Sequence, residues 1–501
     1  MFHRDVRAKA LSHERVRGTL SDRLALILHR KRRVMTEGAL AEMIVERIGF
    51  PPSEDQAGAA AAFARFALCG GQGSAMVLRG SAGTGKTSLA RAVVRTLAAL
   101  GRKAVLMAPT GRAAKVFSLG SGQPAHTIHR KIYRQRTVDA SGGTFRLNDN
   151  LHRNTLFIVD EASMVANTPF SDSPFAAGRL LDDLVRFVYS GQGCRLVLIG
   201  DPAQLPPVGM DSSPALDDCA MEGYGLAVHS CDMDEPLRQR RESGILHNAT
   251  AVRRLIGTGA EDGPVLRTEG FADVAKVDGE ALVESLSRSY REVGVDETIV
   301  VTSSNKRAAA YNQGIRRSVL EMEEVLESGD LLLVAKNNYY WAELAKAGIG
   351  FVANGDRAVV ERMRNVRSEH GFGFADLSLR LPDYGGLELQ ATAVTDCLLS
   401  DAPALTREQA ERLYGCVMED YADIPRKDER VKMMRRDGYF NAMQVKYGYA
   451  VTCHKAQGGQ WAHVYIDRGG LPQDSAGDSY LRWLYTALTR ATEKVFLVNW
   501  K

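Results

Sequence analysis

The stretch that most constrains the fold of this chain is GSAGTGKT at residues 80–87. It fits the phosphate-loop pattern, G-x-x-x-x-G-K followed by Ser or Thr, at every required position. An apolar run at residues 75–78 precedes the motif and predicts a buried strand, and residues 88–100 carry leucine and valine at helical spacing. Strand, loop and helix in this order predict a site that binds phosphate groups.

The loop is suited to a nucleoside triphosphate with magnesium. Its glycines allow a tight turn that aims backbone N–H groups inward, and the following helix adds its positive dipole end. Lys86 is predicted to bridge the β- and γ-phosphates, and the Thr87 hydroxyl to bind Mg²⁺. We therefore expect ATP and Mg²⁺ as ligands, with nucleotide contacts from Gly80, Ser81, Ala82, Gly83, Thr84, Gly85, Lys86, Thr87 and Ser88.

Two carboxylates follow a second apolar run. The sequence TLFIVD at residues 155–160 predicts a buried strand that ends in Asp160 and Glu161. In phosphate-loop ATPases the first carboxylate at this strand end holds magnesium. The second is well placed to polarise the attacking water. Together with the phosphate loop, the pair predicts a site for ATP hydrolysis.

Three further side chains are candidates at this site. Gln204 lies in PAQLPPVG, after an apolar run at residues 195–201, and is predicted to sense the γ-phosphate. Arg238 in EPLRQ offers a cation that would face the nucleotide. Gln56 lies at the start of a predicted helix just before the nucleotide strand, where its amide can form two hydrogen bonds with an adenine edge.

Polar residues after the next predicted strand point to a polyanion. Thr110, Arg112, Thr127 and His129 can donate to backbone phosphates, which is how a protein follows a strand without reading its sequence. A structural role for the histidine is an equal alternative. Residues 133–148 predict a polar hairpin, which is either a wedge for parting two strands or an ordinary surface hairpin.

Length and composition limit the classes of protein. A chain of 501 residues suggests two to four domains, and its 45% hydrophobic content is typical of a globular protein. No apolar run approaches the length of a membrane span, and no signal-peptide pattern opens the chain, so we expect a cytoplasmic protein without membrane contact. Seven cysteines without a C-x-x-C pair indicate neither a metal centre nor a disulfide framework. The net charge of +4 permits a polyanionic partner without requiring one.

Residues 1–34 form a basic tail without a convincing core pattern. The tail can be read as a nucleic-acid-binding arm or organelle address, as a solvated segment, or as sequence upstream of the true start at Met35. We favour the last interpretation, because an amphipathic helix begins at that methionine. Loss of activity in a protein made from Met35 would contradict it.

The second half repeats the alternation of strands and helices. Residues 298–304 predict a strand and residues 306–319 a helix, and the same pattern resumes at residue 449. Between them, residues 330–445 change to short strands and glycine turns, with ANGD at 353–356 as a hairpin turn and one charged helical segment over 406–436. The fold class is therefore α/β, with two doubly wound parallel-sheet domains and a small inserted β barrel.

Seven blocks in this order resemble the motifs of superfamily 1 helicases, most closely the RecD-like and Dda-like branch. The blocks are GSAGTGKT, APTGRAA, VDEAS, GDPAQLPPVG, EPLRQ, VTCHKAQGGQW and YTALTRA, and the resemblance extends from about residue 40 to the end of the chain. It implies a motor whose two RecA-like lobes close on ATP and step along single-stranded DNA in the 5′-to-3′ direction. The inserted barrel would be the SH3-like accessory domain of that branch.

The resemblance also implies roles for individual residues. Lys86, Asp160 and Glu161 would carry the chemistry, Gln204 would be the glutamine of the third motif, and Gln56 the adenine reader. Arg238 and Arg490 would be the arginine fingers. The DNA backbone would be held by Thr110, Thr452 and His454.

The expected organisation follows from these blocks. Lobe 1 would span 35–235 with a hairpin insertion at about 130–150, lobe 2 would combine 236–329 with 446–501, and the accessory insertion would occupy 330–445. The favoured function is unwinding of DNA during repair or recombination, by a monomer that binds single strands and duplex junctions, with a single-strand-binding protein as a further partner. The alternatives are an RNA helicase and an ATP-switched single-strand-binding or loading protein that does not unwind.

Overall fold

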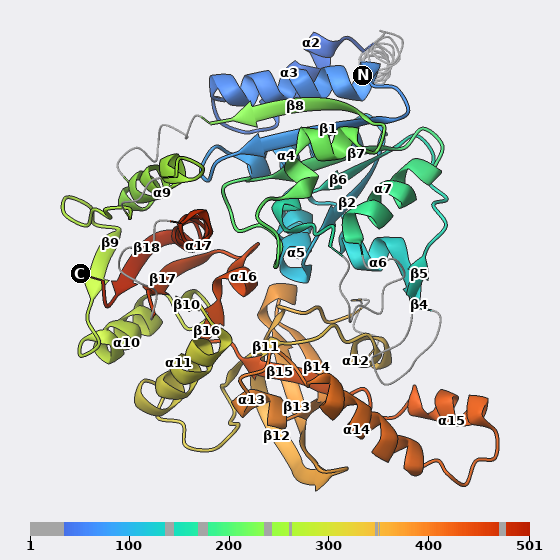
Figure 1. Ribbon diagram of the computed structural model, residues 1–501, viewed down its shortest axis with the longest axis vertical. Helices are drawn as coiled ribbons and strands as arrows, with labels where there is room; N and C mark the ends of the chain where they lie inside the picture. The colour runs from blue at the N-terminus through green and yellow to red at the C-terminus, as the bar shows by residue number, and fades with distance from the viewer. Residues whose placement is uncertain are drawn as a thin grey trace, which may run out of the picture.

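The computed structural model describes residues 35–135, 145–168, 179–234, 243–259, 263–345, 349, 351–469 and 477–500. These residues form two parallel sheets, a closed barrel and a short two-stranded ribbon (Figure 1). The predicted α/β architecture, two doubly wound sheets with an inserted small barrel, is confirmed. None of the described helices is both long enough and apolar enough to span a membrane.

The first lobe is built on a six-stranded sheet with the order β3-β2-β6-β7-β1-β8, in which all paired strands are parallel. Its strands are β1 (Ser74–Gly80), β2 (Lys103–Ala108), β3 (Ala125–Thr127), β6 (Thr155–Val159), β7 (Arg195–Gly200) and β8 (Ala227–Met233). One face packs on α2 (Glu37–Glu46), α3 (Glu54–Cys69), α4 (Lys86–Ala99) and α5 (Gly111–Ser121). The other face packs on α6 (Ile128–Ile132), α7 (Leu180–Ser190) and α8 (Asp218–Glu222).

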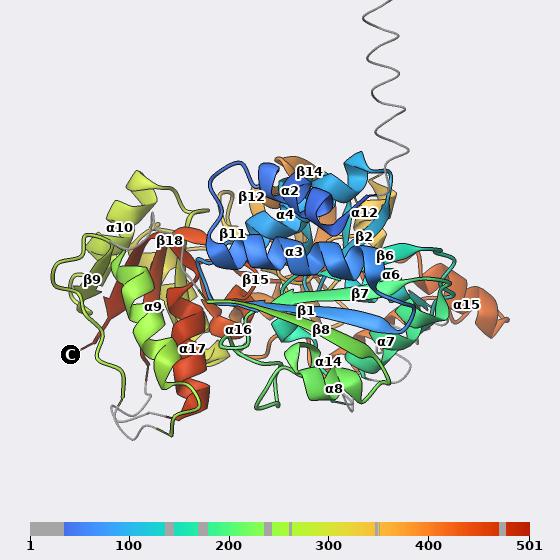
Figure 2. The same cartoon turned by 90° about the horizontal axis from the view of Figure 1, so that it is seen from above.

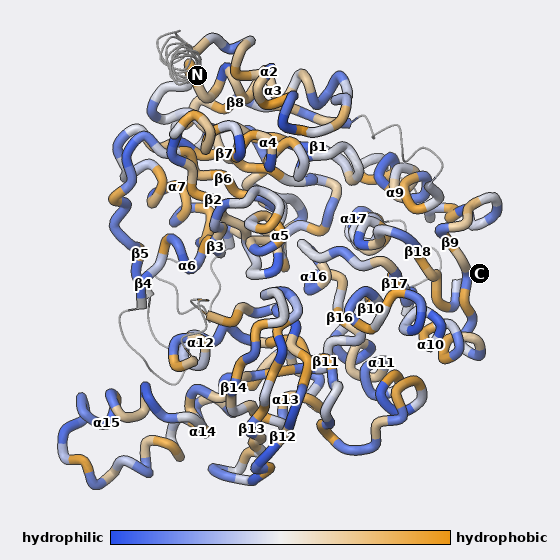
Figure 3. Tube along the Cα trace, turned by 180° about the vertical axis from the view of Figure 1, so that it is seen from behind, coloured by the Kyte–Doolittle hydropathy of each residue, from blue (hydrophilic) through white to orange (hydrophobic). Residues whose placement is uncertain are grey.

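The apolar runs seen in the sequence are the central strands of this sheet. In β1, Met76 and Leu78 pack into the core beneath α3 and α4, whereas Ala75 and Val77 pack into the core on the opposite face. Because both faces are covered, these strands are apolar at successive positions and do not alternate with polar residues. The central strands β6 and β7 are accordingly largely hydrophobic along their length (Figure 3).

The second lobe has a five-stranded parallel sheet with the order β16-β10-β17-β18-β9. Its strands are β9 (Val274–Val277), β10 (Thr298–Thr302), β16 (Ala450–Thr452), β17 (Trp461–Asp467) and β18 (Ala491–Val498). Its helices are α9 (Gly244–Leu255), α10 (Leu282–Glu292), α11 (Asn305–Ser318), α16 (Cys453–Ala456) and α17 (Asp478–Leu488). Figure 2 shows α9 and α17 side by side, close to the first lobe.

A closed barrel interrupts the second lobe between α11 and β16. It consists of β11 (Leu331–Val334), β12 (Arg357–Glu369), β13 (Phe372–Leu381), β14 (Leu387–Val394) and β15 (Met443–Tyr447). Helix α12 (Tyr340–Leu344) connects β11 to β12. Helices α13 (Asp396–Leu399), α14 (Arg407–Glu419) and α15 (Lys427–Met434) lie between β14 and β15.

Two local predictions in the insertion need correction. The charged tract at 406–436 is two helices, α14 and α15, because Pro425 disfavours helical backbone in the residue before it. The ANGD segment does form a turn, with Gly355 at φ 91° and the Asp356 N–H donating to the Ala353 carbonyl at 3.0 Å. However, the connection between β11 and β12 runs over 335–356 and includes α12, so the turn is the end of a long crossing and not a tight hairpin.

The predicted hairpin at 133–148 is represented by its two strands. β4 (Tyr133–Gln135) pairs antiparallel with β5 (Phe145–Leu147), while residues 136–144 lie outside the described part of the chain. The Tyr133 hydroxyl donates to the Asp183 carboxylate of α7 at 2.7 Å, which fixes the base of the hairpin to the first lobe.

Candidate nucleotide site and strand-binding surface

The phosphate loop joins the end of β1 to the start of α4. Gly83 and Gly85 have φ angles of 82° and 83°, a region that glycine enters without steric cost. Gly85 is also the residue that caps α4, so the first N–H groups of this helix face the loop. The local backbone therefore has the form that the sequence motif predicts for phosphate binding.

Lys86 lies over the loop. Its ammonium donates to the carbonyl oxygens of Gly80 at 2.7 Å and Ser81 at 2.9 Å. The positive charge is thereby held at the centre of the loop, between the helix terminus and the acidic pair after β6. The attraction between Lys86 and the Asp160 carboxylate lowers the pKa of that carboxyl, but burial and the nearby Glu161 charge outweigh this attraction.

The acidic pair is strained and poorly solvated. Burial, followed by repulsion from Glu161, raises the pKa of Asp160, whose Oδ1 accepts a hydrogen bond from the Glu161 N–H at 2.9 Å. Glu161 itself has φ 54°, a left-handed conformation that is uncommon for a residue with a side chain. Residues held in such conformations cluster at functional sites.

These residues fit a magnesium ion that is shared with phosphates. Thr87 and Asp160 offer the hard oxygen ligands that Mg²⁺ prefers, and a nearby dication would offset the burial of the Asp160 carboxylate. Within the described residues, no cluster of three or more His, Cys, Asp or Glu forms an all-protein metal cage. Magnesium usually binds through one or two carboxylates, waters and substrate phosphates, so the donor set suits it.

Gln56 has a different environment from the one expected. Its Oε1 accepts from the Ser53 N–H at 3.1 Å, forming the capping box at the start of α3, and its Nε2 donates to the Thr84 carbonyl at 3.1 Å. The side chain is fully buried. In this conformation the amide ties α3 to the phosphate loop, and its role as adenine reader stays a prediction.

The second lobe touches the nucleotide site directly through α17. The Tyr485 hydroxyl accepts a hydrogen bond from the Ala82 N–H of the phosphate loop at 2.8 Å and donates to the Asp201 carboxylate at 2.6 Å. Tyr485 and Asp201 are 1% and 0% exposed. The sequence predicted a role for neither residue. In the YTALTRA block only the arginine was a candidate, and no sequence spacing pairs Tyr485 with Asp201.

Further contacts join the second lobe to the loop after β7. The Leu205 N–H donates to the Thr486 hydroxyl at 2.8 Å, and the Gln457 amide donates to the Leu205 carbonyl at 2.8 Å. Gln204 directly precedes Leu205 in the chain and is 5% exposed, yet its Oε1 has no hydrogen-bond partner within the described residues. A buried acceptor without a donor is costly, so this oxygen is available to a donor such as a water molecule.

Of the two predicted arginine fingers, the structure describes only Arg490, which is bound within its own lobe. Arg490 is 4% exposed and donates to the carbonyls of Thr486 at 3.1 Å and Gly459 at 3.3 Å, and to the Thr489 hydroxyl at 3.1 Å. Its guanidinium is therefore bound within the second lobe, and a finger role requires it to turn. Arg238 lies outside the described residues.

The predicted strand-binding residues of the first lobe are more enclosed than expected. The Thr110 and Thr127 hydroxyls cap α5 and α6, and Thr127 is 5% exposed. The Arg112 guanidinium lies 4.0 Å from the centre of the Trp461 ring and donates to the Gln460 carbonyl at 3.2 Å. Arg112 thus joins the two lobes and is not a free phosphate donor in this conformation.

His129 is held as a neutral side chain. Its ring packs against Tyr133 with centroids 5.8 Å apart, and burial lowers its pKa to about 4. A neutral imidazole can donate one N–H to a phosphate but brings no charge. The sequence left two interpretations of His129 open, a donor to backbone phosphates and a structural side chain. This environment favours the structural role.

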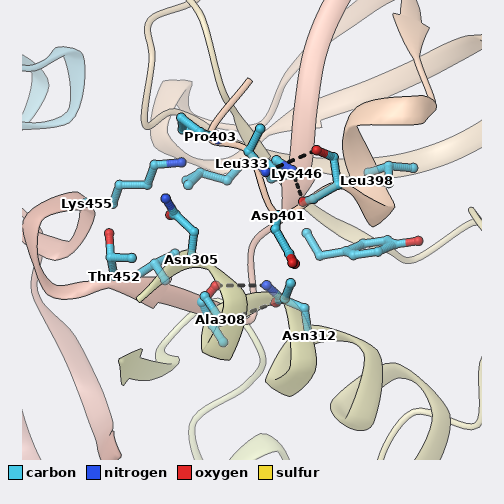
Figure 4. Close-up of a pocket in the computed structure, with 16 residues that line it drawn as sticks. Asn305, Ala308, Asn312, Leu333, Leu398, Asp401, Pro403, Lys446, Thr452 and Lys455 are labelled. Atoms are coloured by element: carbon cyan, nitrogen blue, oxygen red, sulfur yellow. Dashed lines mark hydrogen bonds between the residues drawn. The ribbon is translucent and has the colours of Figure 1, made fainter. Parts of the chain in front are cut away.

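Thr452 lies in a pocket between the second lobe and the barrel (Figure 4). The lobe side is formed by Asn305, Thr452 and Lys455, and Asp401 enters from the segment after α13. Burial lowers the pKa of Lys455, and the nearby charge of Lys446 lowers it further. His454 adjoins this group and is half-buried, which lowers its pKa. Thr452 therefore lies beside a lysine that the sequence analysis did not single out, and contact of Thr452 and His454 with a DNA backbone stays a prediction.

Comparison with known proteins shows which protein families the chain is related to. Residues 53–258 match the AAA domain family, and residues 447–498 match the UvrD-like helicase C-terminal domain family. The chain is 25% identical to the ATP-dependent RecD2 DNA helicase of Deinococcus radiodurans over 84% of its own length, and 25% identical to the ATP-dependent DNA helicase dda of Enterobacteria phage T4 over 52%. The chain belongs to the RecD/Pif1-like branch of superfamily 1. It covers 46% of the length of RecD2 and 56% of dda.

Two further similarities concern another curated helicase and a solved structure. The superfamily 1 chain is 24% identical to the ATP-dependent DNA helicase PIF7 of Trypanosoma brucei brucei, over 84% of its own length and 44% of that relative. A Bacteroides Pif1 helicase solved in complex with ADP-AlF3 and single-stranded DNA aligns over 90% of the chain and 93% of that structure, with 14% identity and a TM-score of 0.46. The two parallel sheets of this superfamily 1 chain are its RecA-like lobes.

Proposed function

We propose that this chain is an ATP-driven DNA helicase that moves along single-stranded DNA from 5′ to 3′ and unwinds duplexes in DNA repair or recombination. Membership of the RecD/Pif1-like branch supports the proposal, and the direction rests on that resemblance alone. The observation that carries it is the hydrogen bond between Ala82 of the phosphate loop and Tyr485 of the other lobe. A bound triphosphate would compete with Tyr485 for the N–H groups of the phosphate loop. Binding and release of the nucleotide would therefore change the contact between this loop and the second lobe.

The proposed hydrolysis divides among residues of the first lobe. Lys86 and the loop N–H groups bind the phosphates, and Glu161 takes a proton from the attacking water. Gln204, whose Oε1 has no donor among the described residues, orients that water. Thr87 and Asp160 would hold Mg²⁺, which supplies charge stabilisation at the phosphates.

The second lobe would complete the site when the lobes close. Arg238 and Arg490 are the proposed arginine fingers, which in related chemistry contribute about a thousandfold or more in rate. For Arg490 this requires release of its three hydrogen bonds within the second lobe. Turnover would thereby depend on a rearrangement of the second lobe.

We further propose that the strand runs over Thr110, Thr452 and His454, with 35–235 as lobe 1, 236–329 with 446–501 as lobe 2 and 330–445 as the accessory insertion. The base of the β4–β5 hairpin is fixed to α7. Such a fixed base is what a hairpin needs if it is to act as a wedge at the duplex junction. The molecule would act as a monomer.

The experiment that tests the proposal is ATP-dependent strand separation on matched duplexes with a 5′ or a 3′ single-stranded tail. We expect only the 5′-tailed duplex to open, and Lys86→Ala to abolish opening. Opening from the 3′ tail would contradict the direction. Hydrolysis stimulated by single strands without strand separation would favour an ATP-switched binding protein, and stimulation by RNA alone would favour an RNA helicase.

A further inference from the structure

The inserted charged tract carries a concentration of positive charge. The segment 425–436, here called the basic arm, has the sequence PRKDERVKMMRR and includes α15. It contains six Lys or Arg and two Asp or Glu, so its net charge of +4 equals that of the whole 501-residue chain. The remaining residues are therefore neutral in sum.

Part of this charge is compensated within the arm. Arg426 pairs with both acids, Asp428 at 2.9 Å and Glu429 at 3.5 Å, and Arg430 donates to the Ile424 carbonyl at 2.6 Å. The other four basic side chains are exposed and form no ion pair with any described residue. They are Lys427, Lys432, Arg435 and Arg436. The exposed charge is thus unbalanced.

The arm is a packed part of the structure. Met434 of α15 is fully buried in a cluster with Val417 of α14 and Phe374 of β13. The Tyr421 hydroxyl donates to the Asp437 carboxylate at 3.0 Å, closing the connection between α14 and α15. The basic side chains are therefore presented from a fixed position.

A chain of contacts joins that position to the β4–β5 hairpin. The Tyr340 hydroxyl of α12 donates to the Arg436 carbonyl at 2.8 Å. The neighbouring Tyr339 stacks on Phe351 at 5.0 Å, and the Arg130 guanidinium of α6 lies 5.1 Å from the same ring. Helix α6 leads directly into β4. Figures 1 and 3 show α15 and the two strands on the same side of the molecule.

We infer that the basic arm binds the sugar–phosphate backbone of duplex DNA beside the hairpin, ahead of the point where the strands part. The inference rests on the proposed function for the location of the duplex. Exposed lysine and arginine suffice for duplex backbone contacts, which need positive charge without base readout. Binding of single strands also uses aromatic platforms for the bases. The arm's aromatic neighbours are engaged, since Tyr421 bonds Asp437 and the Tyr439 ring packs against Phe374 at 4.9 Å.

The test replaces three exposed charges, in the variant K432Q/R435Q/R436Q. Each phosphate contact contributes about 0.9 to the slope of log affinity against log salt, so loss of three lowers the slope by about 2.7. Between 50 and 200 mM salt the wild-type protein should therefore lose about 40-fold more affinity for a 5′-tailed duplex than the variant does. Binding of the single-stranded tail alone, and the ATPase rate that it stimulates, should be unchanged.

The matched control is K276Q/R291Q/R317Q, which removes three exposed charges from β9, α10 and α11 on the other side of the molecule. Equal slopes for wild type and arm variant, or an equal loss in the control, would overturn the inference. A loss of slope on the single-stranded tail would assign the arm to single strands and overturn the duplex assignment. Binding is measured without ATP, so a slope difference without strand separation would refute the proposed helicase function and leave the arm supported.

Discussion

The substitution Tyr485→Phe, which removes one oxygen atom, should weaken the contact between the two lobes in the nucleotide-free protein. The Tyr485 hydroxyl makes the hydrogen bond to Ala82 and the hydrogen bond to Asp201, so the substitution removes both and keeps the buried ring. Asp201 is fully buried and retains the Ala203 N–H at 3.0 Å as a donor to its Oδ1. Its other oxygen and the Ala82 N–H would lose their partner.

The Ala82 N–H alone sets a minimum for the expected effect. A buried polar group left without a partner costs about 1–3 kcal/mol. Since about 1.4 kcal/mol is tenfold in an equilibrium constant, the ratio of closed to open molecules should fall by about 5- to 150-fold. Water can reach Ala82 once the lobes part, so the open form does not bear this cost.

The assay is the distribution of distances between fluorophores placed on α3 and α10, measured without nucleotide. The control is Tyr465→Phe, because Tyr465 is equally buried and its hydroxyl bonds Ser285 at 2.8 Å and Ser289 at 2.7 Å within the second lobe. The control should lower the melting temperature without changing the distances. If Tyr485→Phe leaves the distances unchanged, the contact does not hold the lobes together and the reasoning fails.

Other substitutions probe the site separately. Lys86→Ala should abolish both ATP hydrolysis and unwinding, and an active variant would refute the nucleotide site. Arg490→Ala should leave nucleotide binding nearly intact and abolish turnover, as measured by fluorescent nucleotide titration and steady-state hydrolysis, and equal loss of both would count against a finger role. The lowered pKa of His129, about 4, means that the unfolded chain takes up a proton first as the pH falls. The stability that depends on neutral His129, at most about 3.4 kcal/mol, is fully present above pH 6.5 and is lost as the pH falls toward 4, so His129→Phe should flatten that part of the curve of stability against pH.

The sequence was informative where local chemistry decides the structure. The phosphate loop, the apolar strand before Asp160 and the insertion within the second lobe could be predicted because glycine torsions, burial on both sheet faces and a change to short strands each leave a local pattern in the sequence. The helix start at Gln56 was also recognisable, as a capping box has its own spacing. That the same amide reaches the Thr84 carbonyl was not, because that contact depends on how α3 packs.

The contacts between lobes were beyond such reasoning. Ala82 and Tyr485 are 403 positions apart, and Arg112 meets Gln460 across 348. No local pattern specifies that Tyr485 of α17 faces the phosphate loop, or that Arg490, just after this helix, turns back into its own lobe. The YTALTRA block does contact the phosphate loop, but through Tyr485 and not through Arg490, whose finger role stays a prediction.

The order of strands in the second sheet has a consequence for synthesis on the ribosome. Strand β10 is bordered by β16 and β17, both of which follow the barrel in the chain. The first lobe and then the barrel can complete their sheets as they emerge, since each draws on one continuous stretch, and domains generally fold as units during translation. The second lobe must wait for residues beyond 450, with β10 exposing an apolar surface meanwhile. The nascent protein is thus most prone to aggregation, and most in need of a chaperone, while the barrel is being made.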